Sequence, residues 1–281
     1  MTIVVIGPLT QDQIITPNSK TSATGGASYF QSFVFEDFNI DYVVAANFNN
    51  LDLIKDFPNL ANLIPIVGGD THYFINEYPK KDNSDIRVQY SNFADIPILK
   101  SDLEFVLENV SQVDAFILNP LNRFDFPIET INYLKSFNIP IYLSIQGLLR
   151  LPDEKIDDKN YSIKLEKPDN LDEILNGIEG LFLDENEAKI IFDRDDFDKY
   201  DIGEIIITNA SEGSRIISDG EIKIEAIEVD NIIDSTGCGD TYMAAYILKR
   251  LLSNSPKEAG EFASLIASEK LMSFGPYKSL I

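Results

Sequence analysis

The chain has 281 residues, 44% of them hydrophobic and 25% charged, which is typical of one large α/β domain or two small domains. With 23 Lys and Arg against 46 Asp and Glu, its net charge is −23, so we expect neither nucleic acid nor an anionic membrane as a partner. The single cysteine, Cys238, and the single histidine, His72, exclude an intramolecular disulfide, a Cys-based zinc cluster and a metal site of several imidazoles.

The N-terminal residues carry no cationic segment typical of a secretion signal, and no apolar run approaches the roughly 18 residues of a membrane span. We therefore expect a cytoplasmic protein. A Ser-His-Asp triad would need His72, but the run at 71–75 is typical of a strand. A histidine on a strand or at its rim is the simpler interpretation.

Apolar runs without polar alternation recur along the chain, as in strands buried on both faces of a parallel sheet. They are residues 3–6, 42–46, 115–118, 139–145, 180–183 and 204–208. Helical patterns lie between several of them, at 101–110, 127–137 and 185–192, the first opening with a Ser101-x-x-Glu104 capping box. This alternation predicts an α/β fold with helices on both faces of a mostly parallel sheet.

Two segments interrupt the alternation. Residues 71–78 and 86–90 are strand-like and joined by a polar turn at 79–84; with residues near 12–22 they predict a small β-lid, formed by about 10–24 and 70–95. Asp219-Gly220 separates two further strand-like runs, which is a strong hairpin signal. The sequence contains no internal repeat and no long linker. We therefore predict a single domain, 1–281, that includes the lid.

The most informative segment is Asp234-Ser235-Thr236-Gly237-Cys238-Gly239-Asp240, which precedes a helical pattern. Glycines at the start of a helix allow a ligand to approach the backbone, and the open N–H groups and the helix dipole attract an anion. A tight strand-to-helix turn capped by Asp240 would use the same residues, and spacing alone leaves both interpretations open. The sequence has no Walker motif, and Tyr242 replaces the third glycine of a Rossmann motif.

This segment resembles the C-terminal signature of the PfkB (ribokinase-like) sugar and nucleoside kinases. Weaker matches follow the family's order along the chain. They are Asp12, Gly25-Gly26, Gln146–Arg150, Asp184–Glu187, Thr208–Ser214 and Phe262–Gly275. The match at 146–150 resembles a subset that includes inositol-kinase-like members. The resemblance implies a ribokinase-like fold with a small β-lid.

The resemblance also implies ATP-dependent phosphorylation of a hydroxyl group on a small sugar or sugar-like substrate, assisted by Mg²⁺. Asp240 would be the general base, and the N–H groups of Gly237, Cys238 and Gly239 would stabilise the transferred phosphoryl group. The remaining implied roles are substrate binding by Asp12, Gly25, Gly26, Phe30 and Arg150; nucleotide binding by Asp184, Thr208 and Gly213; Mg²⁺ binding by Glu187, directly or through water; and a candidate K⁺ site at Asp234 and Thr236. Lid strands in this family often pair across a homodimer.

Several positions depart from the family pattern. Phe30 stands where the family usually has a sugar-binding Asn, Asp184 replaces an Asn, and Ala210 stands where a glycine is common. Alternative functions are therefore a nucleoside or inositol (cyclitol) kinase, or a nucleotide- or sugar-binding regulator without catalysis. Cys238 is either a packing residue or a thiol made acidic by the helix N-terminus.

Overall fold

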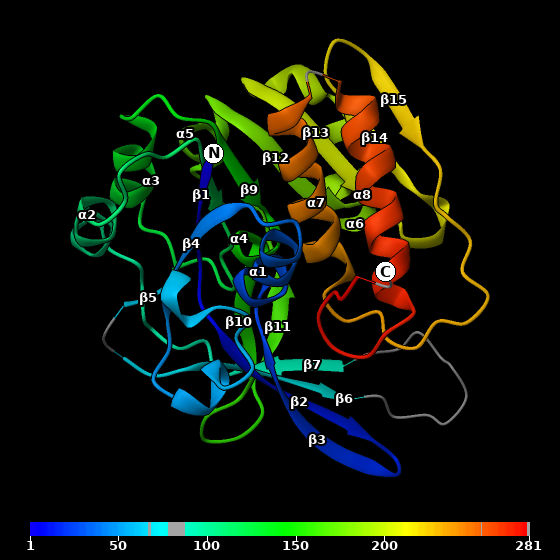
Figure 1. Ribbon diagram of the computed structural model, residues 1–281. Coiled ribbons are helices and arrows are strands. Elements are labelled where there is room, and N and C mark those ends of the chain that lie inside the picture. Colours follow the sequence, from blue (N-terminus) through cyan, green and yellow to red (C-terminus); the bar gives the residue numbers. More distant parts are fainter. Residues whose placement is uncertain (67–68, 78–87, 254, 280–281) are drawn as a thin grey trace.

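The computed structural model describes residues 1–66, 69–77, 88–253 and 255–279, and its strands form two sheets (Figure 1). The larger sheet has nine strands in the order β15-β14-β13-β12-β9-β8-β1-β4-β5. Their bounds are β1 Thr2–Ile6, β4 Asp41–Asn47, β5 Leu63–Ile66, β8 Ala115–Leu118, β9 Ile141–Ser144, β12 Ile178–Asp184, β13 Ile202–Thr208, β14 Ser214–Ile217 and β15 Glu221–Ile224. The strands from β13 to β5 pair in parallel, whereas β14 and β15 are antiparallel.

Helices cover both faces of this sheet (Figure 1). Their bounds are α1 Ala27–Asp37, α2 Lys100–Glu108, α3 Ile128–Lys135, α4 Gln146–Leu149, α5 Leu171–Leu175, α6 Glu185–Ile191, α7 Cys238–Leu252 and α8 Pro256–Leu271. Short 3-10 turns occur at Leu51–Ile54, Leu60–Asn62, Asp193–Asp195, Phe197–Lys199 and Ala210–Glu212.

The central strand β1 explains why its sequence shows no polar alternation. Ile3 and Val5 belong to the core shared with α1, α7 and α8, whereas Val4 and Ile6 belong to the core on the opposite face. All four side chains are fully buried, because each face of the strand has its own layer of helices. The six predicted apolar runs all became strands of this sheet, and the predicted α/β class is confirmed.

The smaller sheet lies across the end of the larger sheet at which the parallel strands finish (Figure 1). Its order is β10-β11-β7-β6-β2-β3, and only β2 and β6 pair in parallel. The bounds are β2 Thr10–Thr16, β3 Ser19–Gly25, β6 His72–Glu77, β7 Val88–Ser91, β10 Arg150–Lys155 and β11 Tyr161–Leu165. Sequence reasoning did not assign β10 and β11 to the lid, because their polar side chains resemble loop residues. The predicted turn at 79–84 lies outside the described residues.

His72, at the start of β6, joins this lid sheet to the main domain. Its Nε2 atom lies 3.1 Å from Oδ1 of Asp125, and each side chain is only 1% exposed. The other Asp125 oxygen, Oδ2, accepts the N–H groups of Leu121 and Asn122. The pair therefore fixes the lid against the loop that follows β8.

The helix α2 differs from its prediction at the N-terminus. The predicted Ser101–Glu104 capping box is wrong, because Lys100 is already helical and Ser101 lies inside the first turn. The carboxylate of Asp102 instead accepts the N–H of Leu99 at 2.7 Å. The Asp219-Gly220 hairpin signal is confirmed by the antiparallel pair β14 and β15. Among the described residues, no helix has the length and apolar character to cross a membrane.

Candidate active site

The N-terminus of α7 is the centre of the candidate site. Gly237 precedes the helix with φ +73° and ψ +9°, a left-handed conformation that favours glycine. The N–H of Thr241 donates to the Gly237 carbonyl at 2.9 Å, and the N–H of Cys238, expected in the anion hole, donates to Ser235 O at 3.2 Å. The N–H groups of Gly239 and Asp240 lie in the first turn of the helix, where no preceding helical carbonyl can accept them. They are the first open amides of α7.

The two glycines of this turn have different surroundings. A Cβ added to Gly237 would collide with the ring of Phe30 on α1, and Phe30 is only 5% exposed. A Cβ added to Gly239 would meet no heavy atom within 4 Å. The space above Gly239 is therefore free for a ligand, while Gly237 rests on the aromatic ring. Phe30, predicted to contact substrate, lies beneath the turn.

Asp240 lies in the first turn of α7, and the pKa of its carboxyl is well above the usual value. Burial raises the pKa of Asp240 to about 6; the charge of Arg150 opposes the increase, and the charge of Asp12 adds to it. These influences require Asp12 and Arg150 to lie near Asp240, although the three residues are far apart in the chain. The structure thus brings together the predicted base and two of the predicted substrate-binding residues.

Asp12 is on the lid strand β2, where Thr10 Oγ1 donates to its Oδ1 atom at 2.8 Å. A Cβ added to Gly25 would collide with Oδ2 of Asp12, so only glycine leaves room for this carboxylate. Gly26 then begins α1 with φ +96°, and a Cβ there would lie 2.6 Å from Pro8 O. The predicted glycine pair therefore allows the lid and α1 to approach each other closely.

Arg150 begins β10 and is 6% exposed. Its guanidinium carbon lies 4.9 Å from the centre of the Phe74 ring, a cation–π contact, and its Nη1 atom lies 3.5 Å from Leu121 O. The Arg150 charge lowers the pKa values of both Asp240 and Glu187. The charge of this buried cation therefore acts on two carboxyl groups that come from different helices.

Asp184 and Glu187 form a capping box at the start of α6. Asp184 Oδ1 accepts the N–H groups of Asn186 and Glu187, and Glu187 Oε2 accepts the N–H of Asp184 at 2.8 Å. Burial raises the pKa of Glu187 to about 7, and the charge of Asp184 adds to this increase. Asp184 is exposed at the end of β12, whereas Glu187 is 6% exposed.

The other predicted nucleotide residues lie at the end of the neighbouring strand. Thr208 ends β13 and pairs with Asp184 on one side and Ser214 on the other. Gly213 has φ +87°, and a Cβ there would collide with Ile224 O. Ala210 has φ +45° in the 3-10 turn between them, a conformation that glycine adopts more easily. Thr208 thus lies at the end of β13, and Ala210 and Gly213 lie in the turn that connects it to β14.

The loop before α7 is held by a residue that sequence reasoning missed. Asp234 Oδ1 accepts the N–H of Thr236 at 2.9 Å, Oδ2 accepts the N–H of Gly275 at 3.1 Å, and Lys270 Nζ donates to Asp234 O at 2.8 Å. Burial would raise the pKa of Asp234, but hydrogen bonds from Thr236 and Gly275 and the Lys270 charge hold it below its usual value. Lys270 could have been noticed as a lysine on the apolar stripe of α8, three positions after Ala267.

Cys238 does not have the acidic thiol that remained an alternative in the sequence. Burial raises the pKa of the Cys238 thiol to about 11, outweighing the charge of Lys270, which lowers it. Its Sγ atom lies 3.5 Å from the carbonyl oxygen of Ala267 on α8. These contacts favour the packing interpretation, in which Cys238 joins the first turn of α7 to α8.

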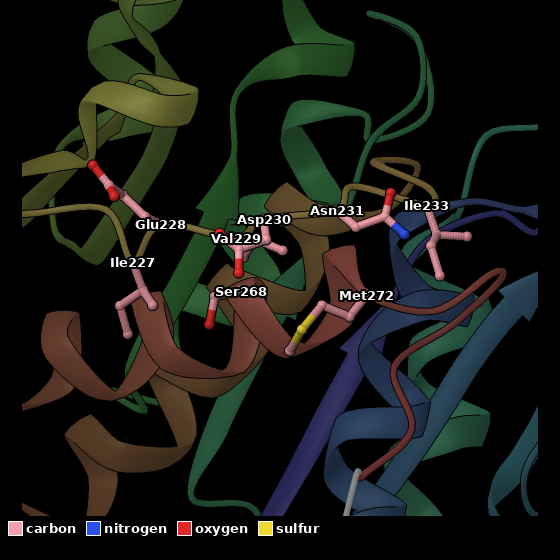
Figure 2. Close-up of a pocket in the computed structure, with 8 residues that line it drawn as sticks. All are labelled: Ile227, Glu228, Val229, Asp230, Asn231, Ile233, Ser268 and Met272. Atoms are coloured by element: carbon pink, nitrogen blue, oxygen red, sulfur yellow. The ribbon is translucent and has the colours of Figure 1, made fainter.

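A pocket of about 360 Å³ lies beside this turn, between α8 and the segment that joins β15 to α7 (Figure 2). The residues that line it are Ile227, Glu228, Val229, Asp230, Asn231, Ile233, Ser268 and Met272. Several of its apolar side chains are exposed, including Ile227, Ile233 and Met272. Exposed apolar groups in such a pocket offer a contact surface to the apolar part of a ligand.

No cluster of three or more His, Cys, Asp or Glu residues suited to a metal occurs in the described part of the chain. This does not conflict with magnesium, which is usually held by one or two carboxylates, several waters and the phosphates of the substrate. Glu187 and Asp184 supply such carboxylates at the strand ends.

Comparisons with known proteins agree with this geometry. Residues 152–281 match a family described as pfkB family carbohydrate kinase. A nucleoside kinase of Methanothermobacter thermautotrophicus is 42% identical over 66 residues, 24% of this chain; the match spans only about a fifth (21%) of that protein. The predicted resemblance to the PfkB (ribokinase-like) kinases is confirmed over residues 152–281.

Solved structures of low sequence identity share the fold across the chain. A pyrophosphate-dependent kinase in the ribokinase family, complexed with a pyrophosphate analog and myo-inositol, has a TM-score of 0.80 at 20% identity, covering 98% of this chain and 97% of that one. Arabidopsis thaliana ribokinase, complexed with ribose and ATP, has a TM-score of 0.72 at 17% identity, covering 98% and 93%. The predicted ribokinase-like fold is thereby confirmed.

The two glycines of the α7 turn give a first prediction. We expect Gly237→Ala to lower the melting temperature, because a left-handed alanine costs roughly 1–2 kcal/mol even without the collision with Phe30. Gly239→Ala should melt at or above the wild-type temperature, since alanine favours a helix by about 1 kcal/mol, yet weaken Mg-ATP or pyrophosphate binding in calorimetry. Wild-type anion affinity in Gly239→Ala would contradict a ligand site above Gly239.

Glu187 gives a second prediction, for metal-free buffer. A carboxyl group whose pKa is higher in the folded state than in the unfolded state stabilises the fold most at low pH, below its usual pKa of 4.5. This stabilisation is lost as the pH rises through the folded-state pKa of about 7. Glu187→Gln should therefore match wild type near pH 4 and exceed it near pH 8 by about 1–3 kcal/mol in free energy of unfolding. Denaturant titration measures the difference. Glu129→Gln, at an exposed position of α3, is the control that should show no such gain; an equal difference at both pH values would contradict the assignment.

Proposed function

We propose that this chain transfers a phosphoryl group from ATP to a hydroxyl group of a small sugar or sugar-like molecule, with Asp240 as general base. The observation that carries this proposal is the carboxyl of Asp240 in the first turn of α7. Burial raises the pKa of this carboxyl to about 6, which is near neutral pH. A general base works best when its pKa is close to the working pH. The match of residues 152–281 to a carbohydrate kinase family supports the phosphotransferase class.

Each neighbouring group has a role in this reaction. Asp12 accepts hydrogen bonds from the substrate hydroxyls beneath the lid, and Arg150 keeps part of the Asp240 population ionised. Asp240 removes the proton from the attacking hydroxyl group. The open amides at Gly239 and Asp240 then stabilise the charge on the transferred phosphoryl group. The lid sheet excludes water, which limits hydrolysis of the donor.

Magnesium is part of the proposal. Glu187, directly or through water, and the exposed Asp184 are the residues that would hold it. When bound, the ion would neutralise charge on the phosphates of the donor. The raised pKa of Glu187 means that lower pH removes the carboxylate that would face the ion. Thr208, at the end of the neighbouring strand β13, and Gly213 would contact the phosphate donor.

The donor has a specific alternative. ATP is favoured by the pocket of about 360 Å³, where Ile233 and Met272 offer apolar surface to a purine ring (Figure 2). Pyrophosphate is the alternative because a solved relative of similar fold uses it. Pyrophosphate has no apolar part, so it would leave this pocket without a role.

The acceptor alternatives are a cyclitol such as myo-inositol, which one solved relative binds, and a nucleoside, the substrate named for the curated relative. Phe30 cannot offer the hydrogen bonds of an asparagine, and its buried ring supports Gly237 instead. Loss of catalysis, with retained ligand binding, is the remaining alternative. A homodimer formed through the lid is also part of the proposal, because the edge strand β3 is exposed.

A donor assay is the third prediction. We expect phosphorylation of at least one sugar, cyclitol or nucleoside with ATP. Met272→Ala should raise the KM for ATP about tenfold, because the apolar surface that Met272 would bury against a purine is worth roughly 1.5 kcal/mol. Any activity with pyrophosphate should be unchanged by this variant. Leu252→Ala, at an exposed position on α7, is the control. Turnover with pyrophosphate alone, insensitive to Met272→Ala, would reject ATP as the donor.

Replacement of the proposed base is the fourth prediction. Asp240→Asn should retain the fold and Mg-ATP affinity but lower kcat by roughly 10²–10⁴-fold, the usual contribution of general acid–base catalysis. In wild type, kcat should rise with pH through about 6 as Asp240 loses its proton. Asp230→Asn, which removes a carboxylate from the nearby pocket, should keep both kcat and its pH profile. An Asp240→Asn variant with more than about a third of wild-type kcat would exclude Asp240 as the base.

A further inference from the structure

Lys270 is a charged residue inside the core next to the candidate site. It lies in the last turn of α8, and its side chain has no exposed surface. Its ammonium Nζ donates to Asp234 O at 2.8 Å and lies 3.3 Å from Asp234 Oδ2. Burial of an ammonium group is costly unless oxygen atoms surround it. This part of the fold is therefore built around a positive charge.

The ammonium ion lies directly behind the turn that leads into α7. Asp234 connects it to Thr236, whose N–H the carboxylate accepts, and Gly237 follows at the left-handed position. The ammonium of Lys270 is also within electrostatic reach of Cys238, the first residue of α7. Its charge acts to lower the pKa of the Cys238 thiol, although burial raises that pKa by more. Lys270 also lies at the negative end of the α8 dipole, which favours a cation.

The sequence predicted a K⁺ site on Asp234 and Thr236, and the residues present do not fit a separate ion there. Two oxygens of Asp234, its carbonyl oxygen and its Oδ2 atom, already contact the ammonium of Lys270. The second predicted ligand, Thr236, is exposed. An ammonium group and a potassium ion carry the same charge and use the same kind of oxygen partner.

We propose that the ammonium of Lys270 is a tethered replacement for a dissociable monovalent cation, and that it positions the 234–237 turn for binding of the phosphate donor. Donor binding and turnover are then independent of K⁺ and Na⁺. Lys270 is a positioning residue, since it acts through Asp234 rather than on the substrate. The inference rests on the proposed function only in taking the donor to be a phosphate compound.

Lys270→Met tests this, because methionine keeps the apolar stem but lacks the terminal Nζ and leaves room for an ion there. Thermal melting and calorimetric binding of Mg-ATP and pyrophosphate would be compared in chloride salts of tetramethylammonium, Na⁺, K⁺ and NH₄⁺, at a constant ionic strength of about 0.1 M. Wild type should respond equally to all four salts. In tetramethylammonium, Lys270→Met should lose about tenfold in donor affinity, and K⁺ or NH₄⁺ should restore most of it and raise the melting temperature.

Lys135→Met is the matched control. Lys135 also donates to two main-chain carbonyls, those of Glu173 and Asn176, but on α3 and away from the site. It should show no dependence on the cation. Activation of wild type by K⁺ would overturn the proposal even if Lys270→Met failed to fold. The proposal would also be overturned by a folded Lys270→Met that binds the donor normally in tetramethylammonium, or that no cation restores.

These binding and melting measurements separate the two proposals. If wild type phosphorylates no acceptor but Lys270→Met still acquires a K⁺ requirement for binding the donor, the proposed function fails and the tethered cation stands. If wild type phosphorylates an acceptor and requires K⁺, the proposed function stands and the tethered cation is excluded.

Discussion

The first turn of α7 is the feature around which the candidate site is assembled. The turn must expose its N–H groups to a ligand while its other side is packed against the core, and these demands meet at Gly237. The left-handed backbone at Gly237 aims the helix outward, and the ring of Phe30 fills the space where a side chain would be. Asp234, Lys270 and Cys238 hold the same turn against α8. Displacement of any of these contacts would change the direction of the open amides.

Charge is the second constraint. A chain with a net charge of −23 repels phosphates in solution, so attraction must be produced locally. The structure has two local sources of positive potential at the candidate site: the amides and dipole of α7, and the buried guanidinium of Arg150. Burial strengthens each charge because little water screens it. The same burial raises the pKa values of Asp240 and Glu187 towards neutrality.

The lid is joined to this arrangement rather than merely placed above it. Asp12 reaches the site from β2, and its carboxylate fits only because Gly25 has no side chain. Arg150 begins the lid strand β10 yet acts on carboxyl groups of α6 and α7. The buried His72–Asp125 pair fixes β6 against the loop whose Leu121 carbonyl lies near Arg150. The position of the lid and the position of the cation are therefore linked.

The parallel sheet, the α7 turn and the order of the family motifs could be predicted from the sequence, because buried strands and glycine turns follow from local pattern. Which distant side chains meet depends on the packing of the folded chain. Asp12 and Arg150 from the lid strands lie near Asp240 of α7. The ring of Phe30, which was predicted to bind substrate, lies against Gly237. The strands β10 and β11 could not be predicted, because their polar residues lack an apolar pattern. The contact of Lys270 with Asp234 forms only when the segment before α7 packs against α8. Such contacts depend on packing between elements far apart in the chain, which no local pattern records.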